Sequence, residues 1–203
     1  MKNIKTINDL IRCYKTLPGI GSKTAETLAY ATLQLSKEER DDFISSFIKC
    51  NDEVKICDKC GFFYEGECPI CNDPKREHSS VMIVSSSKDV LTIDNTEEYN
   101  GLYFILKGTI SPLKNITAQD IGLDKLEKYI AQNNCQEIIL ALPTNIEGET
   151  TSLYITNMFK DSSLNISRLA SGIPLGTNLE YIDNMTISRS IKDRIFIKGV
   201  KDE

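Results

Sequence analysis

The sequence predicts an α/β protein built from several modules, and three observations lead to this fold class. From about residue 80 onward, short apolar runs alternate with amphipathic stretches, which is typical of a mainly parallel sheet with helices on both faces. The amino-terminal part shows only helical spacing of its apolar residues. Between the two parts, four of the chain's seven cysteines lie close together, which indicates a small metal-bound module.

Two helices are expected to open the chain. Thr6 and Asp9 are placed as a cap and its partner for the first of them. Its apolar residues follow helical spacing and are Ile7, Leu10, Ile11, Tyr14 and Leu17. Ser22 is expected to cap the second helix. One side of that helix carries Ala25, Leu28, Ala29, Thr32 and Leu33.

A third helix is expected after Ser36, because Ser36 and Glu39 have the spacing of a capping box. The residues that repeat the spacing of core positions in this helix are Phe43, Ile44, Phe47 and Ile48.

The segment Leu17-Pro18-Gly19-Ile20-Gly21 must turn sharply, and it resembles the hairpin of a helix-hairpin-helix motif. Two glycines let the backbone approach a DNA phosphate, and the first amides of the next helix then point at that phosphate. Such contacts carry no base information, so we expect binding that is independent of sequence. The candidate DNA-binding residues are Gly19, Gly21 and Lys23, with Arg12, Lys2 and Lys15 as further basic contacts.

Two other interpretations of this turn were weighed. Gly21-Ser22-Lys23-Thr24 superficially suggests a nucleotide-binding P-loop, but that loop follows a strand and places Gly directly before Lys, so nucleotide binding is excluded here. An ordinary glycine-containing helical hairpin stays open as the alternative.

The charge distribution agrees with a polyanion held at the amino-terminal end. The net charge is −5, which argues against binding of nucleic acid over the whole surface. Residues 1–24 contain five basic residues and one acidic residue, a net charge of +4, so the remainder carries −9. A solvated basic helix face would explain the same charges.

The cysteines occur as Cys57-Asp58-Lys59-Cys60 and Cys68-Pro69-Ile70-Cys71. This doubled spacing predicts one tetrahedral, closed, structural zinc site, with Gly61 easing the turn. Two disulfides or a redox dithiol are the alternative.

Cys13, Cys50 and Cys135 are interpreted as small buried residues in a reducing cytoplasm. No secretion signal or membrane-spanning run is indicated, so a cytoplasmic protein is expected.

Three buried strands and three helices are expected in the carboxyl-terminal part. The strands are Val81–Val84, Tyr103–Leu106 and Ile138–Leu142. The helices span about Lys88–Asp94, Leu123–Ala131 and Thr150–Phe159. Ligand sites in such sheets lie beyond the carboxyl ends of the strands. Those ends are Ser85–Ser87, Lys107–Thr109 and Pro143–Glu149.

The order of these parts and several motifs resemble the RecR family of recombination mediators. Besides the hairpin and the cysteines, the stretches that resemble the family are Gly108–Leu113, Asp120–Leu123, Leu126-Glu127, Glu147-Gly148-Glu149, Gly172–Gly176, Leu179-Glu180-Tyr181 and Asp183. The resemblance covers essentially the whole chain. It implies a helix-hairpin-helix domain over residues 1–54, a zinc finger over 55–78, a Toprim α/β domain over 79–172 and a Walker-B-like carboxyl-terminal segment over 173–203.

The resemblance also implies a function in recombination. It implies a bacterial cytoplasmic DNA-binding protein that works with RecO, and in many species RecF, to replace single-strand-binding protein by RecA at gaps and breaks. It implies a ring-like homotetramer with the hairpins facing the hole. Glu147 and Glu149 are candidate partner-binding residues.

The chain departs from the Toprim pattern where catalysis would occur. Toprim enzymes carry a glutamate after the first strand and an Asp-x-Asp pair after the third, which hold magnesium. Here these places hold Ser85 and Pro143-Thr144-Asn145, so a two-metal site is absent and Ser85 puts even a residual magnesium site in question. Thr27 stands where the family often has a second basic residue of the hairpin.

Two other segments were assigned no chemistry. His78 is interpreted as an exposed residue of a linker between modules. The segment from Leu179 to Asp183 looks like a Walker B element but lacks a P-loop partner, so a subunit contact or an edge strand is expected there.

Three hypotheses follow from the sequence. The first is a non-enzymatic DNA-binding mediator. The second is a Toprim nuclease or primase that uses Glu147, Glu149 and Asp89 as metal ligands. The third is a scaffold that binds protein partners and touches DNA only incidentally.

Overall fold

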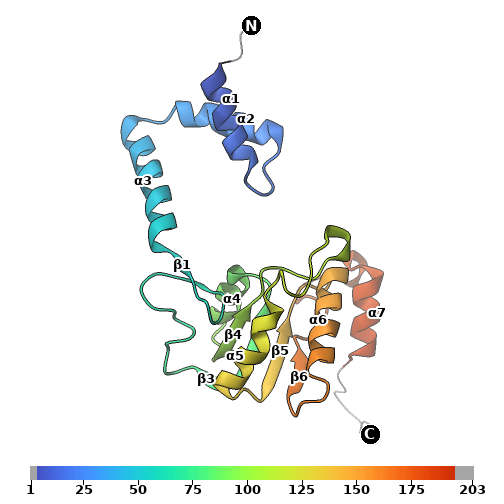
Figure 1. The fold of residues 1–203 in the computed structure, drawn as a ribbon. Helices are drawn as coiled ribbons and strands as arrows, with labels where there is room; N and C mark the ends of the chain where they lie inside the picture. Colours follow the sequence, from blue (N-terminus) through green and yellow to red (C-terminus); the bar gives the residue numbers. More distant parts are fainter. Residues whose placement is uncertain (1–3, 195–203) are drawn as a thin grey trace. The chain divides into compact units, whose positions relative to one another are not determined.

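The computed structural model describes residues 4–194, and the chain divides into two units, residues 1–55 and residues 56–203 (Figure 1). Each unit is described by itself. The module boundaries expected from the sequence are finer than this division and stay predictions.

The amino-terminal unit consists of three helices, α1 (Lys5–Lys15), α2 (Ser22–Leu33) and α3 (Lys37–Glu53). Helices α1 and α2 pack against each other through the small residues Ala25 and Ala29, which are fully buried. The hydroxyls of Tyr14 and Thr32 share a hydrogen bond of 2.6 Å between the two helices. Small residues on α2 therefore let α1 approach closely.

The helix caps differ in part from the expectation. The Ser36–Glu39 capping box of α3 is confirmed, with bonds of 2.8 and 3.1 Å. The cap predicted at Thr6 and Asp9 is wrong, because α1 already begins at Lys5 and Asp9 instead pairs with Arg12 at 3.2 Å. Ser22 is also not a cap, because the extended residue before the helix is Gly21 and Ser22 is the first helical residue.

Among residues 4–194, the apolar face of α3 is not buried in a core. Phe43, Ile44, Phe47 and Ile48 follow helical spacing as expected, yet each is between 50% and 63% exposed. Helical spacing shows only that these residues share one face of the helix. What covers that face is a separate question.

A two-stranded sheet is formed by β1 (Lys55–Ile56) and β2 (Phe63–Tyr64). It begins the metal module, the segment that contains the four clustered cysteines. Between the strands the chain turns at Gly61, whose N–H donates to the Cys57 carbonyl at 2.8 Å and whose φ is +83°. A Cβ at this position would lie 2.7 Å from the carbonyl oxygen of Ile105. Glycine is therefore required both by the backbone conformation and by the close approach of a neighbouring strand.

The α/β domain contains a four-stranded parallel sheet in the order β4-β3-β5-β6, as the sequence predicted for its class. The strands are β3 (Glu77–Val84), β4 (Gly101–Ile105), β5 (Glu137–Ala141) and β6 (Asn165–Arg168). Strand β6 was not predicted, because only Ile166 of its four residues is a large apolar residue. His78 lies within β3 and not in a linker, although it is exposed as expected.

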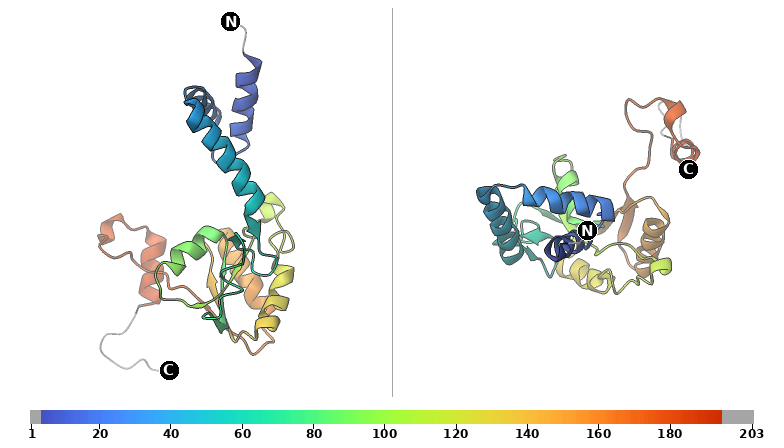
Figure 2. Two further views of the ribbon diagram at one scale, coloured as in Figure 1. Left: turned by 90° about the vertical axis from the view of Figure 1, so that its left-hand side faces the viewer. Right: turned by 90° about the horizontal axis from the view of Figure 1, so that it is seen from above.

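Helices cover both faces of this sheet. They are α4 (Ser87–Asp94), α5 (Leu126–Asn133), which follows the 3-10 turn η2 (Leu123–Lys125), and α6 (Ile146–Met158). The chain moves from β3 to β4 in one direction and then from β4 to β5 in the other, so right-handed crossovers place α4 and α5 on opposite faces. Figure 2, left, shows them on opposite sides of the strands. The core between them includes fully buried Val81, Ile83, Tyr103 and Ile138.

Two short 3-10 turns and one helix complete the described chain. They are η1 (Pro112–Lys114), η3 (Leu179–Tyr181) and α7 (Asn184–Lys192). The edge strand considered for Leu179–Asp183 is wrong, because η3 occupies its first part and Asp183 caps α7 by accepting the Thr186 N–H at 2.9 Å.

The cysteines outside the metal module divide into two kinds. Cys135 is buried as expected, whereas Cys13 and Cys50 are exposed, so the prediction for those two was wrong. Cys13 lies on α1 and Cys50 on α3, and neither helix has a buried residue. Of the helices that the structure describes, none is long and apolar enough to cross a membrane.

Candidate metal centre and nucleic-acid interface

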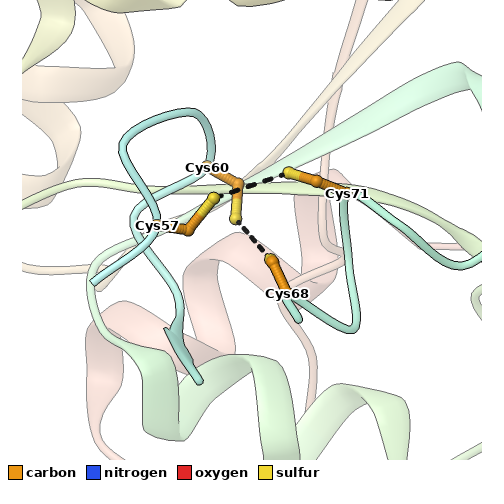
Figure 3. A group of neighbouring side chains, drawn as sticks. All are labelled: Cys57, Cys60, Cys68 and Cys71. Carbon is orange, nitrogen blue, oxygen red and sulfur yellow. Dashed lines mark hydrogen bonds between the residues drawn. The ribbon is translucent and has the colours of Figure 1, made fainter. Parts of the chain in front are cut away.

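The four cysteines of the metal module come together as one cluster. Their sulfur atoms all lie within 4.8 Å of one another, and Figure 3 shows the four side chains converging on a common point. The Sγ atoms of Cys57 and Cys71 are 3.8 Å apart, and those of Cys60 and Cys68 are 3.5 Å apart. The cysteine spacing therefore predicted correctly that these four side chains come together.

These distances fit a tetrahedral metal ion. Zinc with Zn–S bonds of about 2.3 Å holds its sulfurs about 3.8 Å apart. A disulfide would need about 2.05 Å, so the disulfide alternative does not describe this arrangement. Cys57, Cys60 and Cys68 are buried and Cys71 is half-buried. Four thiolates leave no open coordination position, so a bound ion here would organise the fold.

The thiols already differ in acidity. Hydrogen bonding with Cys60 lowers the pKa of Cys71 to about 5. The same interaction raises the pKa of Cys60, and burial raises that of Cys68. Of these three thiols, Cys71 is thus the one most ready to act as a thiolate at neutral pH, and Cys60 and Cys68 would release protons when a metal binds.

Two contacts tie the cysteine cluster to the sheet and to α5. The N–H of Ile105, at the carboxyl end of β4, donates to the Cys60 carbonyl at 2.7 Å. The hydroxyl of Tyr129 on α5 lies 3.9 Å from Cys71 Sγ. Tyr129 is nearly fully buried and its ring lies 5.3 Å from that of Phe104 on β4. Burial raises the pKa of Tyr129, which keeps its proton available for donation.

A third tie, through Arg76, was missed from the sequence. Its guanidinium donates to both carboxylate oxygens of Asp94 at 2.8 and 3.0 Å and to the Gly101 carbonyl at 3.2 Å. It also reaches the carbonyl of Pro69, between the second pair of cysteines, at 3.4 Å. The side chain of Arg76 is 9% exposed. The sequence offered only a basic residue shortly after the cysteines, without its distant partner.

The predicted DNA-binding turn lies on the surface of the amino-terminal unit. Gly19 and Gly21 are exposed and no heavy atom approaches within 4 Å of the place where a Cβ would stand. Gly19 has a φ of +80°, which favours glycine. Gly21 immediately precedes α2, and Lys23 is exposed in the first turn of that helix. The amino-terminal end of α2, whose first amides have no partner within the helix, therefore lies at the surface together with the ammonium group of Lys23.

The other predicted basic contacts have different surroundings. Arg12 is exposed on α1 and is paired with Asp9, and Lys15 is exposed at the end of the same helix. Lys2 lies outside the residues that the structure describes. Thr27, in the place of a second basic residue, donates its hydroxyl to the Lys23 carbonyl at 3.0 Å.

The carboxyl edge of the sheet shows what replaced the Toprim acids. Ser85, at the end of β3, donates its hydroxyl to Asp89 at 3.1 Å. Asn145, after β5, caps α6 by accepting the Gly148 N–H at 2.9 Å. The sequence suggested that Glu147 and Glu149 lie in a loop. Instead, α6 begins at Ile146, so both residues belong to the first turn of this helix.

Glu149 is engaged within the chain. Its Oε1 atom accepts hydrogen bonds from Arg189 on α7 at 3.1 and 3.2 Å, and Arg168 on β6 lies at 3.6 Å. Within residues 4–194, the four cysteines are the only group of three or more potential ligands close enough to share an ion. Asp89, Glu147 and Glu149 therefore do not form such a group.

Comparison with known proteins agrees with this arrangement of parts. Family models match residues 7–46 (RecR, helix-hairpin-helix), residues 79–170 (Toprim domain) and residues 172–195 (RecR, C-terminal). The recombination protein RecR of Bifidobacterium adolescentis is 38% identical over 189 residues, which cover 93% of this chain and 94% of that protein.

The chain belongs to the RecR family.

Other members are similarly close. The recombination protein RecR of Alcanivorax borkumensis is 36% identical over 96% of this chain and 98% of its own length. That of Lactococcus lactis subsp. cremoris is 34% identical over 93% of this chain and 96% of its own length. The RecR resemblance stated from the motifs is thereby confirmed, and with it a role in recombination and repair.

The Toprim match places Ser85 and Asn145 inside the Toprim domain of this RecR-family chain. The fold is retained, while the strand ends that carry acids in Toprim enzymes hold hydroxyl and amide side chains.

Proposed function

We propose that this RecR-family chain is a non-catalytic DNA-binding mediator of recombinational repair in the bacterial cytoplasm. Its role would be to help RecO, and RecF where it is present, to load RecA at single-stranded gaps and breaks covered by single-strand-binding protein. The observation that carries the proposal is the exposed Gly19-Ile20-Gly21 turn with Lys23 at the start of α2.

This turn is suited to a phosphate and not to a base. The first amides of α2 have no partner within the helix, and the helix dipole adds partial positive charge at the same end. The ammonium of Lys23 lies in that first turn. Since phosphates are the same in every sequence, affinity should depend on salt concentration and hardly on base sequence.

The absence of catalysis is supported by the carboxyl edge of the Toprim domain. Ser85 is bonded to Asp89, and Glu149 is bonded to Arg189. Phosphodiester chemistry with two metal ions needs several carboxylates that converge on one place. A nuclease or primase that uses Asp89 and Glu149 as metal ligands would require the two carboxylates to leave Ser85 and Arg189.

Self-assembly into a ring-like homotetramer is supported by the apolar face of α3. Phe43, Ile44, Phe47 and Ile48 are all at least half exposed, which is unusual for four large apolar residues on one helix face. A second copy of the chain would remove this surface from water. Glu147 is proposed as the more accessible partner contact, because Glu149 is already paired with two arginines.

The proposal is tested by fluorescence anisotropy with labelled gapped DNA of two unrelated sequences. Lys23→Glu should weaken binding to both by about tenfold or more and reduce the dependence of affinity on salt, because an attraction to phosphate becomes a repulsion. Lys160→Glu makes the same charge change at an exposed position after α6 and serves as the control. Equal affinities and salt slopes for both variants would exclude the turn as the DNA contact.

A further inference from the structure

A cavity of about 840 Å³ lies between the metal module and the carboxyl ends of β3 and β4. All the residues that line it belong to the carboxyl-terminal unit. It is thus separate from the hairpin of α1 and α2. Cavities of this size accommodate small organic ligands or one to two nucleotides.

One wall of the cavity carries an unusual aromatic residue. Phe63 on β2 is 53% exposed, although its neighbour Phe62 is buried. Ile56 on the paired strand β1 is also exposed, at 56%, and lines the same cavity. The Cys57 N–H donates a hydrogen bond to the Phe62 carbonyl at 2.9 Å, which holds the two strands of this hairpin together next to the cysteine cluster. The ring of Phe63 is therefore exposed on the hairpin that carries Cys57 and Cys60.

Three lysines from three separate segments also line the cavity. Lys59 comes from the metal module, Lys107 follows β4, and Lys125 precedes α5. Between residues 4 and 194, none of the three takes part in an ion pair. Two carboxylates, Asp58 and Asp124, share the lining.

The balance of charges shows which interaction dominates. Zinc held by four thiolates carries a net charge of 2−, so this cluster and the two aspartates offset the three lysines. A strongly anionic ligand held by charge alone is therefore disfavoured. A ligand that combines an apolar ring face with a few phosphates fits better, because stacking on an aromatic ring supplies affinity that does not come from charge.

We propose that this cavity binds single-stranded DNA, with a base stacked on Phe63 and the adjacent phosphates near Lys59, Lys107 and Lys125. In a duplex the base faces are covered by neighbouring bases, so only an unpaired strand offers a free face. The inference rests on the proposed DNA-binding function and adds to it a second contact that selects the unpaired part of a gap.

The test compares single-stranded and duplex DNA with the full-length, zinc-loaded protein. Phe63→Ala should weaken binding of an unpaired thymidine oligonucleotide by about 5- to 100-fold, the range expected for the loss of one stacked base. Affinity for duplex DNA and the salt slope should stay as in the wild type. Phe63→Tyr keeps a stacking ring and should restore binding, and Tyr154→Ala removes a half-exposed aromatic from α6 as the control.

A second measurement keeps the test valid if Phe63→Ala misfolds. Oligonucleotides that carry 5-iodouracil form photo-crosslinks to a stacked aromatic ring, and peptide mapping of the wild type should find the crosslink at Phe63. No crosslink at Phe63, or an equal loss of single-stranded and duplex binding in Phe63→Ala, would overturn the inference. A change in oligomeric mass caused by Phe63→Ala would also overturn it, because the ring would then belong to a subunit interface.

The effect of Phe63→Ala can be distinguished from the effect of Lys23→Glu, which tests the hairpin. Lys23→Glu should reduce binding of both DNA forms and lower the salt slope. Loss with Lys23→Glu alone would support the hairpin and reject the cavity. Loss with Phe63→Ala alone would support the cavity and reject the hairpin.

Discussion

Tyr129 and Arg76 connect the cysteine-containing module to the α/β domain by contacts between residues that are far apart in the sequence. Tyr129 lies 58 residues after its contact Cys71, and Arg76 binds Asp94 on α4. Groups that hydrogen-bond metal ligands fix the ligands' orientation and tune metal affinity. Tyr129 contacts a candidate ligand directly, whereas Arg76 holds the carbonyl of Pro69 between two of them.

Tyr129→Phe should accelerate the release of zinc to a chelator by about 2- to 10-fold. The variant removes one weak hydrogen bond to the Cys71 thiolate and keeps the buried ring, and a single such bond contributes about 0.5–1.5 kcal/mol. The rate is followed with a zinc-binding dye at constant temperature. Tyr154→Phe, at a half-exposed position on α6, is the matched control.

An unchanged release rate in Tyr129→Phe would show that the 3.9 Å contact is only packing. An unchanged circular dichroism spectrum of the variant is required, since it shows that the ring still fills its site.

At the scale of single residues, the sequence predicted the clustered cysteines but not the residues that contact their module from elsewhere in the fold. Cys57, Cys60, Cys68 and Cys71 were identified because the spacing of a metal turn is local. Arg76 and Tyr129 were missed, because their partners are brought close only by the fold. The engagement of Glu149 by Arg189 was hidden for the same reason.

Helix α6 illustrates how an element depends on a single close contact. The N–H of Gly148 donates to the Asn145 side chain, and a Cβ on Gly148 would lie 1.8 Å from the carbonyl oxygen of Pro143. The helix thus folds back tightly against the end of β5. The buried hydroxyl of Thr151 extends the contact by accepting the Ile110 N–H at 2.9 Å.

Gly148→Ala should destabilise the protein by about 2 kcal/mol or more, because the first turn of α6 must move away from Pro143. Urea unfolding of the zinc-loaded protein measures this change. Gly172→Ala is the control, since no heavy atom lies within 4 Å of its Cβ position. Equal stability of the two variants would mean that the turn adapts without cost.

The sequence predicted the existence of elements more reliably than their ends. Buried strands β3, β4 and β5 were found from continuous apolar runs, because both faces of a parallel strand are covered. The start of α6 was placed too late, since Gly148 looks like part of a loop. Strand β6 was missed because its exposed polar residues lack the apolar pattern that identifies a buried strand.

At the scale of the whole molecule, three features have separate tasks. The basic end of the chain carries the glycine turn, the four cysteines cluster in the module that follows, and the strand ends of the Toprim domain are followed by Ser85 and Asn145. The sequence indicated this order of parts before the fold was known. It did not show that the apolar face of α3 is left uncovered, because helical spacing gives a shared face and not its partner.

The most direct test of the central claim, DNA binding without phosphodiester chemistry, uses end-labelled gapped DNA with the zinc-loaded protein and Mg²⁺. The same samples are run on native gels, which report binding, and on denaturing gels, which report strand length. We predict a mobility shift with every strand intact and none extended when nucleotides are supplied. Magnesium-dependent cleavage or extension that is lost in Glu147→Gln would contradict the account.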